Sequence, residues 1–509
     1  MLFVLEERYA APSFAEVTEK HKRPAMDSRT NASRLGESLK GIVMRALAGA
    51  ALSAILVLPA AAQTRPDQVK FREIYKELVE TNTTLSSGSC TLAAQRMGAR
   101  LKAAGFPDRD LHYFAESKNP KEGGLVVILP GSDPKAKAVL LLAHIDVVEA
   151  RREDWTRDPF KLVEEGGYFY GRGTADMKGQ AAIWVDMLAR FKQEGVKHRR
   201  TLKLALTCGE ETSYAFNGAK WLANNRRQLI DAEFALNEGG GGRLDASGKR
   251  LLLTVQAGEK HFQNYRLEVT NIGGHSSRPT PDNAIYRLAQ ALTKISAYQF
   301  PITSNEATRA FFAALGPQVG GKMGAAMTTF AKNPTDSQAV ATLTSDPSHN
   351  AIMHTTCVAT LLDAGHANNA LPQRARANIN CRIFPGTSVE QVRLRLARLV
   401  ADPQVKVTTL EKRNEVVKSP PLTPQIMEPV KAAAAKIWPG VPVAPVMLAG
   451  ATDSTFLNPV GIPTYGVTGI FGEHDGNGAH GLNERIRVRS LYEGRDFLTE
   501  VVKTYANQP

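Results

Sequence analysis

Residues 140–148 read LLLAHIDVV, in which an apolar run that begins at Val139 ends in two polar side chains, His144 and Asp146. A buried polar group costs free energy unless a partner satisfies it, so both side chains need partners. The apolar run has the length and composition of a strand covered on both faces. The stretch therefore predicts an α/β sheet with His144 where one of its strands ends.

Similar short apolar runs occur on both sides of this stretch, at 124–129 (GLVVIL), 201–208 (TLKLALTC) and 232–240 (AEFALNEGG). Between them, residues 179–195 repeat apolar side chains at the spacing of an amphipathic helix. Residues 66–104 also have a helical pattern. Strands that alternate with helices predict an α/β catalytic domain.

The pattern changes near Lys260. The order of strand-like and helix-like segments from 261 to 410 is strand, helix, strand, strand, helix, strand, which predicts a small α+β, ferredoxin-like domain. The predicted organisation is an N-terminal extension (1–62), a catalytic domain in two parts (63–259 and 413–509) and an inserted lid or dimerisation domain (260–412). Residues 298–350 are an additional insertion to which the pattern assigns no structure.

The N-terminus resembles an export signal. Arg45 precedes an apolar stretch from Ala46 to Leu58, and three alanines at 60–62 form a cleavage site before Gln63. The apolar stretch is shorter than the ~20 residues of a membrane span, so we expect no stable membrane span after signal cleavage and a periplasmic or secreted protein. A start at Met26 or Met44 would explain the polar residues before it.

Charge and cysteine content limit the partners. The chain of 509 residues has a formal net charge of +13, but no basic run interleaved with aromatic residues and no zinc-finger, KH or RRM signature, so we expect no nucleic-acid partner. Cys357 and Cys381 are each 12 residues from Asn369 in a predicted hairpin, and would face each other. A disulfide between them is a hypothesis for an exported protein.

Six further side chains follow or adjoin the predicted strands: Asp146, Asp176, Glu210, Glu211, Glu238 and His480. Function gathers at the carboxyl ends of strands in open α/β sheets, and His, Asp and Glu supply the nitrogen and oxygen ligands of zinc. Taken singly, each has another interpretation, such as a hydrogen-bonded core histidine or a solvated acidic turn. The loop GRGTADMKG (171–179) lacks the spacing of a phosphate-binding loop and is better interpreted as a turn that presents Asp176.

Six motifs in order carry a family resemblance: HIDVV, GRGTADMKG, GEET, NEGG, GGHSSRP and HGLNE. Together they resemble the di-zinc metallopeptidase family of aminoacylase, carboxypeptidase G, carboxypeptidase S, carnosinase and succinyl-diaminopimelate desuccinylase. The resemblance extends from about Gln68 to Tyr505, and the stretch 144–160 is most similar to the carboxypeptidase S branch. It implies a zinc-dependent hydrolase that acts on peptide or other amide bonds.

The resemblance also implies roles for single residues. Asp176 would bridge two Zn²⁺ ions, with His144 and Glu238 at one ion and Glu211 and His480 at the other. Glu210 would be the general base, and Asp146 would support His144 by accepting from its ring N–H. In the inserted domain, His275 would stabilise the oxyanion, often across a dimer. Substrate would be held by Arg382, Asn369, Gly450 and Thr452.

The expected function is hydrolysis of a small peptide or N-acyl amino acid by a metal-activated water, in a homodimer formed through the inserted domain. Two alternatives stay open at this level: a deacylase of a non-peptide amide, and a non-catalytic metal- or ligand-binding protein on the same scaffold. The physiological substrate and the choice between carboxypeptidase and dipeptidase action are not determined by these motifs.

Overall fold

The structure is a computed structural model that describes residues 65–212, 216–410 and 418–509. The predicted N-terminal extension and signal peptide, residues 1–62, lie outside the described residues. Within the described ranges, no helix combines the length and the apolar character that crossing a lipid bilayer requires.

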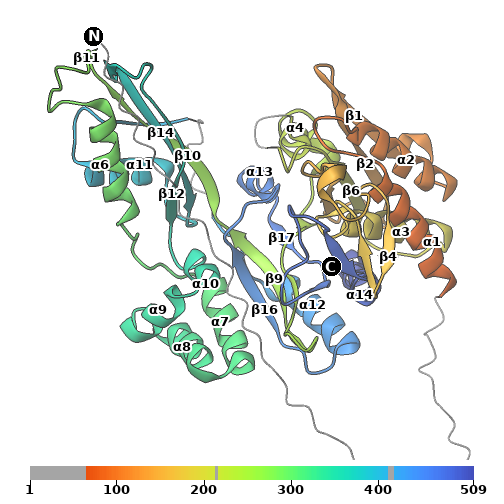
Figure 1. Ribbon diagram of the computed structural model, residues 1–509. Coiled ribbons are helices and arrows are strands. Elements are labelled where there is room, and N and C mark those ends of the chain that lie inside the picture. Colours follow the sequence, from red (N-terminus) through yellow and green to blue (C-terminus); the bar gives the residue numbers. More distant parts are fainter. Residues whose placement is uncertain (1–64, 213–215, 411–417) are drawn as a thin grey trace, which may run out of the picture. The chain divides into compact units, whose positions relative to one another are not determined.

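A ten-stranded mixed sheet forms the centre of the catalytic domain (Figure 1). Strands β3 (Val139–His144), β6 (Leu202–Thr207) and β7 (Phe234–Asn237) are parallel neighbours within it. The other strands are β1 (Leu111–Glu116), β2 (Asn119–Leu129), β8 (Gly241–Leu244), β9 (Arg250–Glu259), β16 (Val443–Leu448), β17 (Thr464–Gly466) and β18 (Phe471–Gly472). A separate small sheet consists of β4 (Val163–Glu165), β5 (Tyr168–Tyr170) and β19 (Arg485–Arg487).

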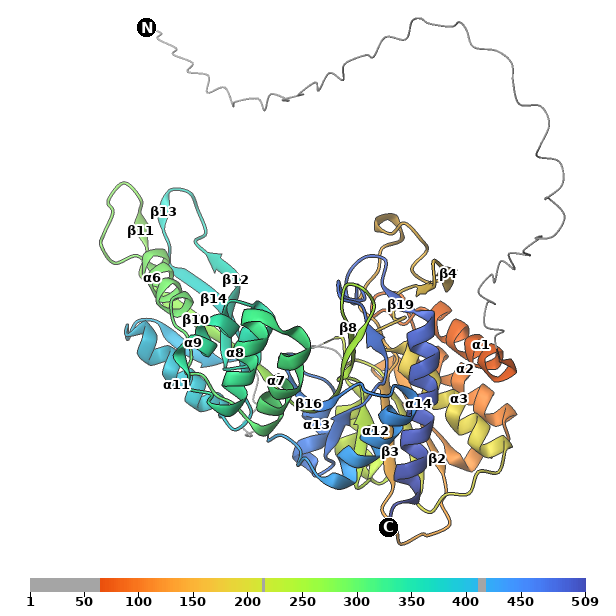
Figure 2. The same cartoon turned by 90° about the horizontal axis from the view of Figure 1, so that it is seen from below.

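The burial of β3 explains why its sequence is apolar at every position. Val139, Leu141 and Ala143 belong to one hydrophobic cluster, whereas Leu140 and Leu142 belong to another. Successive side chains of a strand point to opposite faces, so both faces of β3 are covered. The first cluster includes residues of α1 (Pro66–Glu80), α2 (Cys90–Ala103), α3 (Lys178–Gln193), α12 (Pro424–Ile437) and α14 (Val488–Asn507); the second includes residues of α4 (Gly218–Asn225), α5 (Arg227–Ile230) and α13 (Ser454–Leu457). Figure 2 shows α12 beside α14.

The inserted domain has the predicted order of elements. Strands β10 (His261–Thr270), β12 (Thr356–Ala364), β14 (Arg374–Ile383) and β15 (Lys406–Thr409) form one antiparallel sheet in the order β12-β14-β10-β15. Helices α6 (Ala284–Ser296) and α11 (Val389–Val400) pack on this sheet around a core of their own. A two-stranded ribbon adds β11 (Gly274–His275) and β13 (Ala370–Leu371). The α/β fold with an inserted α+β domain is thus confirmed, while the boundaries at 259/260 and 412/413 stay predictions.

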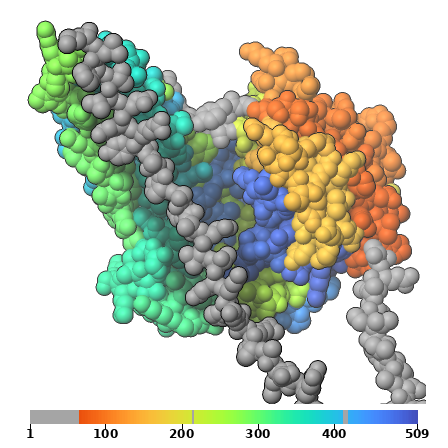
Figure 3. All heavy atoms as spheres, viewed as in Figure 1, coloured from red at the N-terminus to blue at the C-terminus, as the bar shows by residue number. Residues whose placement is uncertain are grey.

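The insertion at residues 298–350, which had no assigned structure, is helical. It contains α7 (Glu306–Val319), α8 (Gly321–Lys332), α9 (Ser337–Thr344) and most of α10 (Pro347–Ala351). Side chains of these helices share a hydrophobic cluster with Leu252 of β9 and with Ala444 and Val446 of β16. The space-filling view shows the blue-green surface of this insertion at the lower left (Figure 3).

Two disulfides join the four cysteines. Cys357 of β12 is paired in register with Cys381 of β14, and the hypothesised disulfide joins them. The second disulfide joins Cys90, at the start of α2, to Cys208, which directly follows β6. Nothing in the local sequence predicts this second pair, because it closes a loop of 118 residues between separate elements.

Thiol titration of the denatured protein tests both disulfides. We expect no free thiol before reduction and four thiols per chain afterwards, since no cysteine is left unpaired. Two thiols before reduction would show that one of the disulfides does not form.

Candidate metal centre

Parallel strand pairing brings the first candidate residues to one edge of the sheet. His144 is the last residue of β3 and pairs with Thr207, the last residue of β6. Glu210 and Glu211 lie in the turn that follows β6, and Glu238 directly follows β7. All of these side chains therefore emerge at the carboxyl ends of neighbouring parallel strands, where ligands bind in α/β sheets.

The carboxylates gather around two imidazoles. The Nε2 atom of buried His144 lies 3.3 Å from Oδ1 of Asp176 and 3.7 Å from Oε2 of Glu238. The Nε2 atom of His480 lies 3.1 Å from Oδ2 of Asp176 and 3.0 Å from Oε2 of Glu211. The two oxygens of Asp176 thus face different histidines, and this carboxylate lies between two clusters of donors.

The carboxylate of Asp146 was expected to accept from the ring N–H of His144, but its main contacts lie elsewhere. The Nδ1 atom of His144 lies 3.1 Å from the main-chain carbonyl oxygen of Asp146 and 3.6 Å from its carboxylate. The carboxylate instead accepts from the backbone N–H groups of Glu211, at 3.0 Å, and Glu210, at 3.4 Å. Because β3 ends at His144, Asp146 is no longer in the strand, and its side chain supports the turn after β6 as well as His144.

Buried Glu484 holds the loop that carries Asp176. Its carboxylate accepts hydrogen bonds from the backbone N–H groups of Gly173 (2.8 Å), Ala175 (2.7 Å) and Asp176 (3.0 Å), and from the Arg172 side chain (2.8 Å). Glu484 is four residues after His480, so one short segment contributes a candidate ligand and supports another. The glycine-rich loop is therefore held at a defined position despite its composition.

Electrostatics show how crowded the site is. Burial raises the pKa of Glu211 to about 7 and also raises that of Glu210. The hydrogen bond to Asp176 raises the pKa of His480 to about 9. Burial would raise the pKa of Asp176 too, but the nearby imidazoles of His144 and His480 outweigh it and keep that pKa low. Buried carboxylates at this density need protons or cations to balance their charge.

The donor set fits divalent metal ions. Two overlapping groups have ligand atoms within 4.8 Å of one another, namely His144 with Glu210 and Glu238, and His144 with Asp176 and Glu211. The Nε2 atom of His144 is buried and has no hydrogen bond from the described residues, so a ligand atom is directed into the cluster without a protein partner. Nitrogen and oxygen donors of this kind suit zinc and similar ions.

A pocket of about 540 Å³ adjoins the cluster. Glu210, Glu211 and His480 line it together with Arg382, from β14, and Thr452. The Arg382 guanidinium lies over the Phe262 ring, 5.4 Å from its centre. The pocket thus combines carboxylates and an imidazole with a cation that can hold a substrate carboxylate.

The predicted oxyanion donor His275 and two predicted substrate residues, Asn369 and Gly450, do not line this pocket. His275 lies exposed on β11, where its Nδ1 accepts from the Ser277 hydroxyl at 2.8 Å. Asn369 lies exposed in the turn before β13, and its carbonyl accepts from the backbone N–H of Ser276 at 3.0 Å. Gly450 is exposed, one residue before the pocket residue Ala451.

Two further buried carboxylates near the site were not anticipated. Asp453 lines the pocket and accepts from Asn217, at 2.8 Å, and from the Thr207 hydroxyl, at 3.1 Å. Glu259 accepts from the backbone N–H and the hydroxyl of Thr452, at 3.0 and 2.9 Å. Glu484, described above, was also missed. Asp453 lies within the motif GATDST and Glu484 ends the motif HGLNE, so the sequence could have indicated both. No motif contains Glu259.

Comparison with known proteins identifies the family. Residues 140–504 match Peptidase family M20/M25/M40. The human N-fatty-acyl-amino acid synthase/hydrolase PM20D1 is 27% identical over 450 residues, which cover 86% of this chain and 88% of that protein. The probable carboxypeptidase S-like 2 of Dictyostelium discoideum is 28% identical, over 74% of each chain. The chain therefore belongs to the M20/M25/M40 peptidase family and is a hydrolase of the metallopeptidase and amidohydrolase type.

The fold is also similar to that of a solved M20 family structure. The M20 family metallo-carboxypeptidase Sso-CP2 of Sulfolobus solfataricus superimposes with a TM-score of 0.64 at 16% identity, covering 86% of this chain and 99% of that one. The predicted family and the predicted enzyme class are both confirmed.

Replacement of Asp146 tests its supporting role. Asp146→Asn leaves a single acceptor oxygen for two backbone donors, so we expect the affinity for zinc to fall about 10–100-fold. Competitive titration with a chelator measures this affinity, and circular dichroism checks the fold. The matched control is Asp363→Asn, at an exposed residue of β12. Equal affinity in both variants would contradict the role of Asp146.

Proposed function

We propose that this member of the M20/M25/M40 family hydrolyses the amide bond of small peptides or N-acyl amino acids at a centre of two zinc ions. The observation that carries the proposal is the Asp176 carboxylate between the imidazoles of His144 and His480, next to a pocket that the Arg382 guanidinium lines. The human relative is named for N-fatty-acyl amino acids and the archaeal one for carboxypeptidase activity. Both names concern an amide bond next to an amino acid.

In this proposal Asp176 would be a ligand shared by two zinc ions. His144 and Glu238 would hold one ion, and Glu211 and His480 would hold the other, as the separations of 3.0–3.7 Å between their donor atoms support. When bound, the ions supply Lewis-acid polarisation of the scissile carbonyl and make water more acidic.

Glu210 is the proposed general base. It lies in the same turn as Glu211, within 4.8 Å of ligand atoms of His144 and Glu238, and burial raises the pKa of its carboxyl group. A carboxylate with a raised pKa can take a proton from the attacking water and return it to the leaving nitrogen. Adjacent residues divide these tasks because consecutive side chains point in different directions.

Arg382 is the proposed anchor of the substrate carboxylate, since a guanidinium can bind a carboxylate through two hydrogen bonds. Thr452, which lines the same pocket, is a proposed substrate contact, as are Asn369 and Gly450. His275 is the proposed oxyanion donor. Its exposed position on the β11–β13 ribbon is consistent with action in a neighbouring subunit.

The proposed homodimer forms through the inserted domain. Strand β12 is an edge strand of its sheet, and it exposes Val358 (60%), Leu361 (71%) and Leu362 (67%). An exposed edge with a row of apolar side chains favours pairing with another chain.

Export is supported by the two disulfides, because such bonds persist in oxidising compartments such as the periplasm. The N-terminal sequence with its charged start, apolar stretch and alanine-rich end supports the same location.

Variants of two neighbouring glutamates test the centre. Glu210→Gln removes the base but no proposed ligand, so we expect turnover to fall about 10²–10⁴-fold while two zinc ions per chain remain. Glu211→Gln is the matched comparison and should lose zinc. The assays are elemental analysis and a hydrolysis panel of dipeptides, N-acetyl amino acids and N-succinyl amino acids, with and without chelator. Full activity of Glu210→Gln, or a wild type without bound metal, would contradict the proposal.

Mixing two inactive variants tests the dimer and His275 together. If His275 acts across subunits, a heterodimer of His275→Ala and Glu210→Gln contains one complete site. Random exchange of subunits then restores about a quarter of the wild-type activity. Light scattering shows whether dimers are present. Dimers that regain no activity on mixing would show that His275 acts within its own chain, and a fully active monomer would exclude the proposed dimer.

A further inference from the structure

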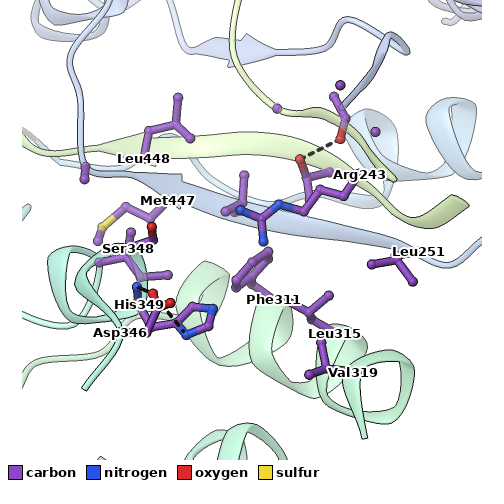
Figure 4. Close-up of a pocket in the computed structure, with 18 of the residues that line it drawn as sticks. Arg243, Leu251, Phe311, Leu315, Val319, Asp346, Ser348, His349, Met447 and Leu448 are labelled. Carbon is purple, nitrogen blue, oxygen red and sulfur yellow. Dashed lines mark hydrogen bonds and ion pairs between the residues drawn. The ribbon is translucent and has the colours of Figure 1, made fainter. Parts of the chain in front are cut away.

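The molecule has a second large cavity, of about 760 Å³, formed where the helical insertion faces β8, β9 and β16 (Figure 4). Phe311, Leu315 and Val319 are spaced four residues apart on α7 and line one wall. Met323 and Met327 of α8 line it with the same spacing. Side chains four apart lie on one helix face, so both helices present a continuous apolar stripe to the cavity.

The walls are more suited to a flexible apolar occupant than to a polar one. Methionine side chains adapt to irregular apolar shapes. The volume is within the range of roughly 300–1,000 Å³ for small-molecule sites. The helices of the insertion share a hydrophobic cluster next to the cavity. Val319 on the cavity wall is nevertheless 44% exposed, so this part of the wall is not covered by the protein itself.

Two carboxylates on the rim have protein partners: Asp346 accepts from the backbone N–H of His349 at 2.9 Å, and Glu473 forms a 2.7 Å ion pair with Arg487. The Nδ1 atom of His349 is buried without a hydrogen bond from the described residues. The Arg243 guanidinium lies over the Phe311 ring, 5.4 Å from its centre, as Figure 4 shows. An apolar chain in the cavity would therefore leave these pairs intact.

The cavity adjoins the candidate metal centre. Gly240 lines the cavity and is two residues after the proposed ligand Glu238. Leu448 and Ala449 also line the cavity. Gly239 itself is closely packed, because a Cβ atom added there would lie 1.6 Å from Oε1 of Gln256 and 3.2 Å from Cδ1 of Leu448. The loop after Leu448 then contributes Ala451 and Thr452 to the catalytic pocket. One short loop thus separates the two spaces.

We propose that this cavity receives the acyl chain of an N-acyl amino acid substrate. The inference rests on the proposed function: the amino-acid carboxylate binds Arg382, the amide lies at the carboxylate and histidine cluster, and the chain extends past the loop of residues 449–451 into the cavity. Ala449 lines the cavity, Ala451 lines the catalytic pocket, and a Cβ atom added at Gly450 between them would meet no atom within 4 Å. The insertion then selects substrates with long, apolar acyl groups.

Chain-length dependence tests the proposal. The substrates are the N-acetyl, N-octanoyl and N-dodecanoyl derivatives of one amino acid that the hydrolysis panel identifies, assayed with the full chain loaded with zinc. Each CH₂ group transferred from water into an apolar site favours binding by about fourfold. We expect kcat/KM to rise at least about a hundredfold from acetyl to dodecanoyl, since several such groups become enclosed.

Two variants of α8 locate the effect. Met323→Glu places a charge in the cavity, and the matched control Ala325→Glu places the same charge on an exposed position of the same helix that does not line the cavity. We expect Met323→Glu to abolish most of the chain-length gain and to leave N-acetyl hydrolysis unchanged. Ala325→Glu should behave as the wild type does.

Calorimetry with dodecanoate, the carboxylate product of the longest substrate, separates the two proposals. We expect the wild type and Ala325→Glu to bind it and Met323→Glu to lose at least about tenfold in affinity. Hydrolysis with no dependence on chain length would overturn the acyl-chain site and leave the proposed function standing. If no substrate is hydrolysed, the proposed function fails, and absence of dodecanoate binding would overturn the acyl-chain site as well.

Discussion

The interaction on which this structure depends is the crowding of carboxylates around two imidazoles at the ends of parallel strands. Asp176 lies between His144 and His480, and Glu211 and Glu238 approach the same histidines. Such a cluster is stable only if a positive charge balances it and if rigid elements hold its members together. The fully buried strand β3 provides one such element, since both of its faces are packed.

Buried polar side chains that are not proposed ligands hold the rest of the site. Asp146 fixes the turn that carries Glu210 and Glu211, and Glu484 fixes the loop that carries Asp176. The Cys90–Cys208 disulfide anchors the start of the same turn to α2. In each case a carboxylate or a covalent bond holds the backbone near the cluster, so that the proposed ligands are held in position.

Several features could be predicted because they depend on local sequence. The apolar run before His144 indicated a strand covered on both faces, and the equal distances of Cys357 and Cys381 from Asn369 indicated their pairing. The helices at residues 306–351 could not be placed, because their apolar stripes serve a cluster shared with β9 and β16, which are distant in sequence. For the same reason Glu259 was missed: its partner Thr452 is 193 residues away.

The sequence by itself determined which residue types are available for the chemistry, the order of the strands that carry them and the family to which the chain belongs. These follow from short motifs and from periodicity, which depend on neighbours along the chain. Only the tertiary structure decided that the carboxylate of Asp146 supports the turn after β6, that Glu484 holds the Asp176 loop, and that an apolar cavity lies beside Gly239. These depend on contacts between residues far apart in sequence, and packing in three dimensions selects such contacts without leaving a local pattern.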